Sequence, residues 1–293
     1  MLALGACRSR LLLSTLRPAA SMVLLAALAL SGLWRPPPVT RLVTGARRLV
    51  ACAPSREPRL LLTSAGLTTP ELKSSFFSML RRASAPGATP SIAMLVTAQM
   101  APSGTPSKRS AGELRRRRWQ TAVKNAKAIE AQLGVSIECV DCANDKKPAE
   151  EFELPLSKAE CIWVTGGNTF YLWHWMRETG VDAIIKQRVL EQGALYVGQS
   201  AGAIVAGNSI RPALWKGWDD PAAGGALDGV EWTEGRLKSM GLVRRRVFFP
   251  HYDDQWAKTV DERKADLGGT KVMCLTDDGT TAYVSGEDEE GDC

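Results

Sequence analysis

The segment that most constrains the fold is residues 193–210, GALYVGQSAGAIVAGNSI. The apolar run at residues 194–197 predicts a buried strand, and this run ends at Gly198. Ser200 comes two residues later and is followed by small residues, and the residues beyond it can begin a helix. Because glycine tolerates backbone conformations that other residues avoid, the sequence predicts a strand, a sharp turn with Ser200 at its apex, and a helix.

The turn also contains the spacing G-x-S-x-G at residues 198–202. This spacing can present a serine as a nucleophile, because the glycines leave its hydroxyl exposed and the first amides of the helix point at the same place. A glycine-rich and serine-rich turn with no chemical role has the same composition, and such pentapeptides also arise by chance. The motif alone leaves both interpretations open.

Short apolar runs alternate with helical segments through the rest of the chain. Strands are expected at residues 60–63, 91–97, 135–140, 161–165, 194–197 and 247–249, and helices at residues 70–82, 113–133, 169–177, 181–192 and 256–267. Residues 271–275 and 281–284 predict a closing hairpin around the turn at residues 277–279. The alternation indicates one α/β domain over residues 58–293, with a mostly parallel, doubly wound sheet covered by helices on both faces.

Two glycine-containing loops follow predicted strands, at residues 166–168 and 198–202. Ligands of such sheets bind beyond the carboxyl ends of the strands, so we expect the two loops to meet at one site. The amides of Ala201 and of the Gly166-Gly167 loop are candidates for an oxyanion hole, although a plain strand-ending turn explains the glycines equally well. No G-x-G-x-x-G fingerprint follows a strand, and no cofactor is expected.

A nucleophilic serine needs a base and a third group that orients the base. The sequence has two histidines. His174 lies on a predicted helix among large apolar residues and is interpreted as a packed side chain, whereas His251 follows a strand and a proline, where catalytic bases tend to lie. The sequence therefore favours His251.

The orienting carboxylate is expected at Asp219 or Asp220, which lie between Ser200 and His251 in the sequence. Residues 253–254 are also acidic, but they are too close to His251 in sequence to reach around it easily. The alternative interpretation of Asp219-Asp220-Pro221 is a turn, because Asp-Pro favours turn initiation.

Four segments in this order resemble the serine peptidases of the dipeptidase E (alpha-aspartyl dipeptidase) and cyanophycinase group. They are TGGNTF at 165–170, GQSAGA at 198–203, the Asp-Pro element at 219–221, and Pro250-His251. The resemblance covers about residues 59–284. It implies a flavodoxin-like three-layer sandwich related to class I glutamine amidotransferases, with serine in place of the amidotransferase cysteine. It also implies hydrolysis of small peptides through an acyl-enzyme, without metal.

The resemblance assigns roles to particular positions of this chain. These are Ser200 as nucleophile, His251 as general base, Asp219 as acid with Asp220 as the fallback, Gly167 and Ala201 as oxyanion amides, and Asn168 and Arg263 as substrate-binding residues. The chain also departs from the family pattern. The arginine that holds a substrate aspartate falls on Val260, and the nearby Arg263 is a weak substitute. Peptidase chemistry is thus better supported than specificity for N-terminal aspartate.

Two other functions remain open on the sequence alone. An esterase of the α/β-hydrolase class shares G-x-S-x-G and the order Ser, Asp, His, but this chain lacks an HGGG-type loop. An amidotransferase-like fold without catalytic activity, used for ligand binding, is the second alternative.

The formal net charge of +6 comes from the N-terminal part of the chain. Residues 1–56 hold eight of the 37 basic residues and no acidic one, which leaves 29 basic against 31 acidic residues in the rest. The nearly neutral remainder argues against nucleic acid as a partner. Residues 1–57 are interpreted as a removable targeting segment for a plastid or mitochondrion.

The apolar block at residues 23–30 keeps a secretory signal as the second choice for this segment, with a cytoplasmic protein as a further alternative. The block is too short for a confident membrane span, so no stable membrane insertion of the mature domain is expected. The seven scattered cysteines indicate a reducing compartment. Cys139 and Cys142 have C-x-x-C spacing, but no second pair or nearby histidine completes a metal site.

Overall fold

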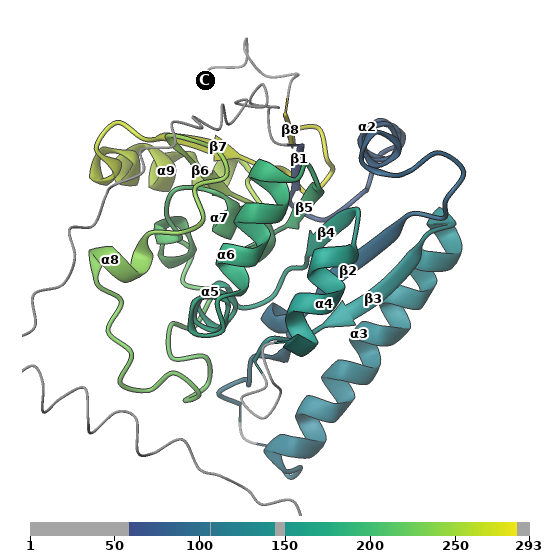
Figure 1. Ribbon diagram of the computed structural model, residues 1–293. Helices are drawn as coiled ribbons and strands as arrows, with labels where there is room; N and C mark the ends of the chain where they lie inside the picture. The colour runs from purple at the N-terminus through teal and green to yellow at the C-terminus, as the bar shows by residue number, and fades with distance from the viewer. Residues whose placement is uncertain (1–58, 106, 144–149, 286–293) are drawn as a thin grey trace, which may run out of the picture. The chain divides into compact units, whose positions relative to one another are not determined.

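A mostly parallel sheet organises the computed structural model, which describes residues 59–105, 107–143 and 150–285 (Figure 1). Within these residues, six strands form the main sheet in the order β3-β2-β4-β5-β1-β8. Their bounds are β1 Leu60–Thr63, β2 Ser91–Leu95, β3 Ser136–Val140, β4 Cys161–Val164, β5 Leu195–Gln199 and β8 Tyr283–Val284. The first five strands are parallel, and β8 pairs antiparallel with β1. The expected sheet type is confirmed.

Helices cover both faces of this sheet and complete three layers. The bounds are α2 Pro70–Ala83, α3 Ala111–Leu133, α4 Glu150–Lys158, α5 Thr169–Glu178, α6 Val181–Lys186 and α7 Ala201–Ala206. Figure 1 shows α2 and α3 on one side of the sheet and α4 to α7 on the other. This follows from the strand order, because right-handed crossovers place helices on opposite faces when the direction of winding reverses.

Local sequence explains where these helices begin and end. Thr69, Ser110 and Asn168 each accept a hydrogen bond from an amide in the first turn of the helix that follows. Gly134 ends α3 in the left-handed conformation that favours glycine. The strands β1 and β4 are buried along their whole length, as expected of parallel strands covered on both faces.

A second, smaller sheet replaces the hairpin expected at the end of the chain. In it, β6 (Arg246–Phe249) pairs in parallel with β7 (Lys271–Cys274). The prediction that residues 271–275 pair with residues 281–284 is therefore wrong. The chain does turn at residues 277–279, but β8 then crosses to the edge of the main sheet, where β1 offers an unpaired side. The turn places Asp277 beyond the carboxyl end of β7.

The helix α4 was not expected from the sequence, because Pro155 interrupts the helical pattern. Parallel pairing nevertheless requires a crossover connection between β3 and β4, and such connections are usually helical. β3 and β4 both pair in parallel with β2, so the chain must cross back over the sheet between them.

The described residues lie within one unit that extends over residues 53–293. The expected targeting segment at residues 1–57 lies outside the described residues. In the described part of the chain, no helix combines the length and the apolar character needed to cross a bilayer.

The packing of α7 on the sheet depends on Gly202. A Cβ atom at this position would lie 2.1 Å from the carbonyl oxygen of Val164 in β4. We expect Gly202→Ala to lower the free energy of unfolding by about 1–3 kcal/mol or more, because the helix must move away from the sheet. Urea denaturation measures this. The control is Gly112→Ala in α3, where nothing lies within 4 Å of the added atom. Equal midpoints for the two variants would contradict the prediction.

Candidate active site

Ser200 lies at the sharp turn between β5 and α7, as the sequence predicts. Its backbone has φ 51° and ψ −109°, a conformation that a non-glycine residue rarely adopts. Such strain persists only where the surrounding structure holds it, and it is common at functional sites. The turn places the Ser200 side chain beyond the carboxyl end of the parallel strands, where two other loops reach it.

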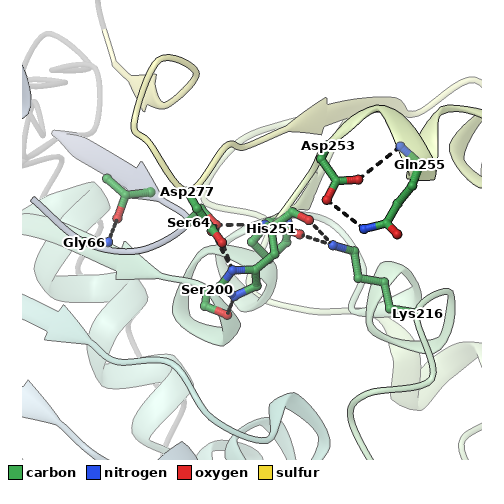
Figure 2. A network of polar contacts seen from close by, with 10 residues as sticks. Ser64, Gly66, Ser200, Lys216, His251, Asp253, Gln255 and Asp277 are labelled. Carbon is green, nitrogen blue, oxygen red and sulfur yellow. Dashed lines mark hydrogen bonds and ion pairs between the residues drawn. The ribbon is translucent and has the colours of Figure 1, made fainter. Parts of the chain in front are cut away.

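His251 contacts Ser200 directly. Its Nε2 atom lies 2.8 Å from Ser200 Oγ, and the residue follows β6 and Pro250 at a strand end (Figure 2). His251 also has a positive φ of 54°. The other histidine, His174, lies on α5 with its ring 5.3 Å from that of Trp175. The structure therefore brings together Ser200 and the histidine that the sequence favours.

The carboxylate on the far side of the histidine is Asp277. Its Oδ1 atom lies 2.6 Å from His251 Nδ1. This differs from the expectation of Asp219 or Asp220. Asp219 Oδ2 accepts a hydrogen bond from Thr169 N at 3.1 Å, and Asp220 accepts from backbone amides of its own turn. The expectation relied on the order of residues in the sequence and on the family resemblance, whereas the parallel pairing of β6 and β7 brings the turn after β7 next to His251.

Ser64 joins the histidine and the carboxylate, and sequence reasoning did not identify it. This buried side chain follows β1. Its hydroxyl accepts a hydrogen bond from His251 N at 2.8 Å and donates one to Asp277 Oδ1. A serine followed by small residues at a strand end was the only available signal, and such a signal is common. Figure 2 shows Ser64 beside the other two residues.

These contacts keep Asp277 ionised. Burial by itself raises the pKa of its carboxyl, but hydrogen bonds from Ser64 and His251 and the nearby positive charges outweigh it. The net result is a pKa below the ordinary value for aspartate. Asp219 behaves in the opposite way, since burial raises its pKa and the hydrogen bond from Thr169 offsets this only in part.

The Gly166-Gly167 loop adjoins Ser200, as expected. A Cβ atom on Gly166 would lie 3.1 Å from Ser200 Cβ. Gly167 has φ 135°, and a Cβ atom there would lie 2.3 Å from the carbonyl oxygen of Ala98, so only glycine fits. Among the described residues, no protein group accepts a hydrogen bond from the amides of Gly167 or Ala201. Both backbone N–H groups are therefore free hydrogen-bond donors near Ser200.

The two residues expected to bind substrate are placed differently. The Asn168 side chain is bonded at both ends within the protein, because Oδ1 accepts from Tyr171 N and Nδ2 donates to Asp220 O, both at 2.8 Å. Asn168 thus ties the glycine loop to the segment after α7. Arg263, at the end of α9 (Ala257–Arg263), forms an ion pair with Asp266 at 4.0 Å. No contact in the described part of the chain joins Arg263 to Ser200 or His251.

The described residues contain no group of three or more histidine, cysteine, aspartate or glutamate side chains arranged to hold a metal ion. Cys139 and Cys142 are both free thiols. Cys142 is buried against the Thr97 hydroxyl, and this burial raises its pKa to about 12. A thiol with such a pKa stays protonated and unreactive at neutral pH.

A serine, a histidine and a carboxylate in hydrogen-bonded sequence, at the strand ends of an α/β sheet, define a candidate serine hydrolase site. Peptidase family S51 matches residues 110–290, which include Ser200, His251 and Asp277. The chain belongs to this family. The match confirms the expected relationship to dipeptidase E.

Curated relatives match part of the chain. An uncharacterised peptidase of Listeria monocytogenes is 39% identical over 84 residues, which are 29% of this chain and 39% of that protein. Peptidase E of Salmonella newport is 38% identical over 110 residues, or 38% of this chain and 45% of that protein. The matches thus span less than half the length of these relatives.

Solved structures extend the comparison to the fold. A peptidase from an acI-B1 actinobacterium matches with a TM-score of 0.50 and 18% identity, covering 75% of this chain and 80% of that one. A candidate peptidase E from Listeria monocytogenes has the same TM-score at 19% identity and is covered to 91%. These likenesses confirm the fold class.

Proposed function

We propose that this protein is a serine peptidase that hydrolyses small peptides, with Ser200 as nucleophile, His251 as general base and Asp277 as the orienting carboxylate. One observation carries the proposal. Ser200 Oγ lies 2.8 Å from His251 Nε2, while the other ring nitrogen of the same histidine lies 2.6 Å from Asp277. Membership of peptidase family S51 supports it.

The proposed reaction uses these contacts in order. His251 Nε2 takes the proton of the Ser200 hydroxyl as Oγ attacks the carbonyl carbon of the peptide bond. The amides of Gly167 and Ala201 stabilise the negative oxygen of the tetrahedral intermediate. His251 then gives its proton to the leaving amine, and a water molecule hydrolyses the acyl-enzyme by the same route. Asp277 remains ionised and stabilises the imidazolium.

The segment at residues 211–235 supports a preference for small peptides. It contacts the glycine loop through Thr169–Asp219 and Asn168–Asp220 hydrogen bonds. Its Trp218 side chain is 60% exposed, with its ring 5.9 Å from that of His251. The segment therefore lies along the rim of the site, where it limits the size of a substrate.

We expect no preference for an N-terminal aspartate. Arg263 makes no contact with the site in the described residues, and Lys216, which lies beside His251, donates to backbone carbonyls. A library of dipeptides incubated with the full chain tests this expectation. Dipeptides that begin with neutral residues should be hydrolysed at least as fast as those that begin with aspartate.

The same assay separates the alternative functions. Turnover of p-nitrophenyl esters without turnover of any peptide would identify an esterase. A fluorophosphonate reagent that fails to label Ser200, together with no turnover of either substrate class, would overturn the enzymatic proposal in favour of a binding protein.

A further inference from the structure

We propose that Lys216 is a positioning residue that holds the backbone carbonyls of Pro250 and His251 and thereby fixes the His251 imidazole between Ser200 and Asp277. The proposal rests on the proposed function, because it concerns the histidine assigned there as the general base. Lys216 does not touch the reacting atoms, and neither the motifs nor the family resemblance indicates a role for it.

The Lys216 ammonium group forms its hydrogen bonds with the backbone at His251, the residue proposed as the general base. Its Nζ atom donates hydrogen bonds to Pro250 O, at 2.9 Å, and to His251 O. Two consecutive carbonyls thus point to one cation. Figure 2 shows the Lys216 side chain reaching this turn from the side opposite Ser64.

Three aromatic rings surround the same ammonium group. Nζ lies 4.3 Å from the ring centroid of Trp218, 4.4 Å from that of Phe249 and 4.7 Å from that of Trp256. Cations are attracted to the faces of aromatic rings at such distances. The rings come from the 211–235 segment, from β6 and from the short helical turn Asp254–Trp256, so the cation joins three parts of the chain around the histidine.

The backbone of His251 needs this support. Its φ of 54° is unfavourable for a residue with a side chain, and such a conformation persists only where neighbouring groups hold it. Ser64 Oγ accepts from the N–H of His251 on one side, and Lys216 holds its C=O on the other. With both backbone groups fixed, the ring is aimed at Ser200. Released from Lys216, the turn can relax towards an ordinary conformation and the imidazole shifts.

The charge of Lys216 depends on pH within the working range of an enzyme. Burial lowers its pKa to about 8, and nearby negative charges oppose this shift. The titratable groups that face it are Asp253, Asp277, Cys274 and His251. The ammonium form predominates below pH 8. Above that pH the neutral amine loses its attraction to the rings and one of its three donors, so the hold on the turn weakens.

The experiment compares four forms of the full chain: wild type, Lys216→Met, Lys216→Arg and Lys258→Met. Lys258 is the matched control, because it lies on α9 with an 86% exposed side chain. The measurement is the rate constant for labelling of Ser200 by a fluorophosphonate, over a pH range that brackets pH 8. This readout needs no knowledge of the natural substrate.

We expect Lys216→Met to label roughly 10²-fold more slowly than wild type, since a small misplacement of a catalytic group has an effect of this size. The wild-type rate should fall as the pH rises through about 8, and this fall should be absent in Lys216→Met. Arginine stays charged at high pH, so Lys216→Arg should recover part of the rate and keep it above pH 8. Lys258→Met should match wild type.

Nuclear magnetic resonance of isotope-labelled histidine provides a second readout. The chain has two histidines, and the variant His174→Gln assigns their signals. In wild type, the His251 Nδ1 proton bonded to Asp277 should give a distinct downfield signal, and Lys216→Met should broaden or shift it. Wild-type labelling rates with an unchanged signal in Lys216→Met would overturn the proposal for Lys216 alone. Absence of both labelling and peptide turnover in wild type, with a changed signal in Lys216→Met, would overturn the peptidase proposal and leave the positioning role supported.

Discussion

Replacing Ser200 with alanine is expected to lower kcat for peptide hydrolysis by about 10⁴- to 10⁶-fold, because the variant has no atom to form the acyl-enzyme. The residual rate comes from substrate binding and from the amides of Gly167 and Ala201, which the substitution leaves in place. Labelling by a fluorophosphonate should disappear completely. Initial rates of dipeptide hydrolysis and mass spectrometry of the labelled protein measure the two effects.

The control for this prediction is Ser209→Ala. Ser209 lies just beyond α7, and its hydroxyl accepts a hydrogen bond from Arg211 N, away from His251. This variant should keep wild-type activity and labelling. Circular dichroism should show the same fold for both variants. Undiminished turnover by a folded Ser200→Ala would disprove the mechanism.

Replacing Asp277 with asparagine is expected to lower kcat by about 10⁴-fold, the size seen when the orienting carboxylate of a serine hydrolase becomes an amide. The amide does not stabilise the imidazolium, and it can hold the His251 ring in the wrong tautomer. The comparison variant is Asp219→Asn, whose carboxylate contacts Thr169 N and not the histidine. Its loss should be much smaller.

Steady-state kinetics of the two variants tests which carboxylate orients the histidine. The candidates are Asp277, which contacts His251 in the structure, and Asp219, which the sequence favoured. A larger loss in Asp219→Asn than in Asp277→Asn would mean that the histidine changes its partner during the reaction. The pH profile adds a check. Because contacts in the folded protein keep the pKa of Asp277 below its ordinary value, wild-type activity should not fall at mildly acidic pH through protonation of this group.

Much of the fold could be predicted because it depends on local patterns. The buried strands and their alternating helices follow from runs of apolar residues, and the caps of α2 and α3 follow from Thr69 and Ser110. The turn at Ser200 and the neighbouring Gly166-Gly167 loop could be placed together because both follow parallel strands. Each of these inferences uses residues that are close in sequence or strands of known direction.

The remaining parts of the site depend on pairings that the sequence does not encode locally. Asp277 lies 26 residues after His251, and Ser64 lies 187 residues before it. Residues 271–275 and 281–284 have the alternation of a hairpin, yet β7 pairs with β6 and β8 pairs with β1. The choice between these partners depends on which strand edges are free in the folded protein. Sequence order and the family resemblance therefore favoured Asp219, and topology favours Asp277.

The division of the strands between two sheets has a consequence for how the site responds to motion. His251 and Asp277 both follow strands of the small β6–β7 sheet, and the hydrogen bonds Leu275 N to Phe249 O and Tyr252 N to Leu275 O, each 2.9 Å, continue its ladder between them. Ser200 follows β5 of the main sheet. A displacement of the small sheet relative to the large one would carry the base and its carboxylate together. It would change the distance from Ser200 to His251, and it would also stretch the hydrogen bonds of the base and its carboxylate to Ser64, which follows β1 of the main sheet.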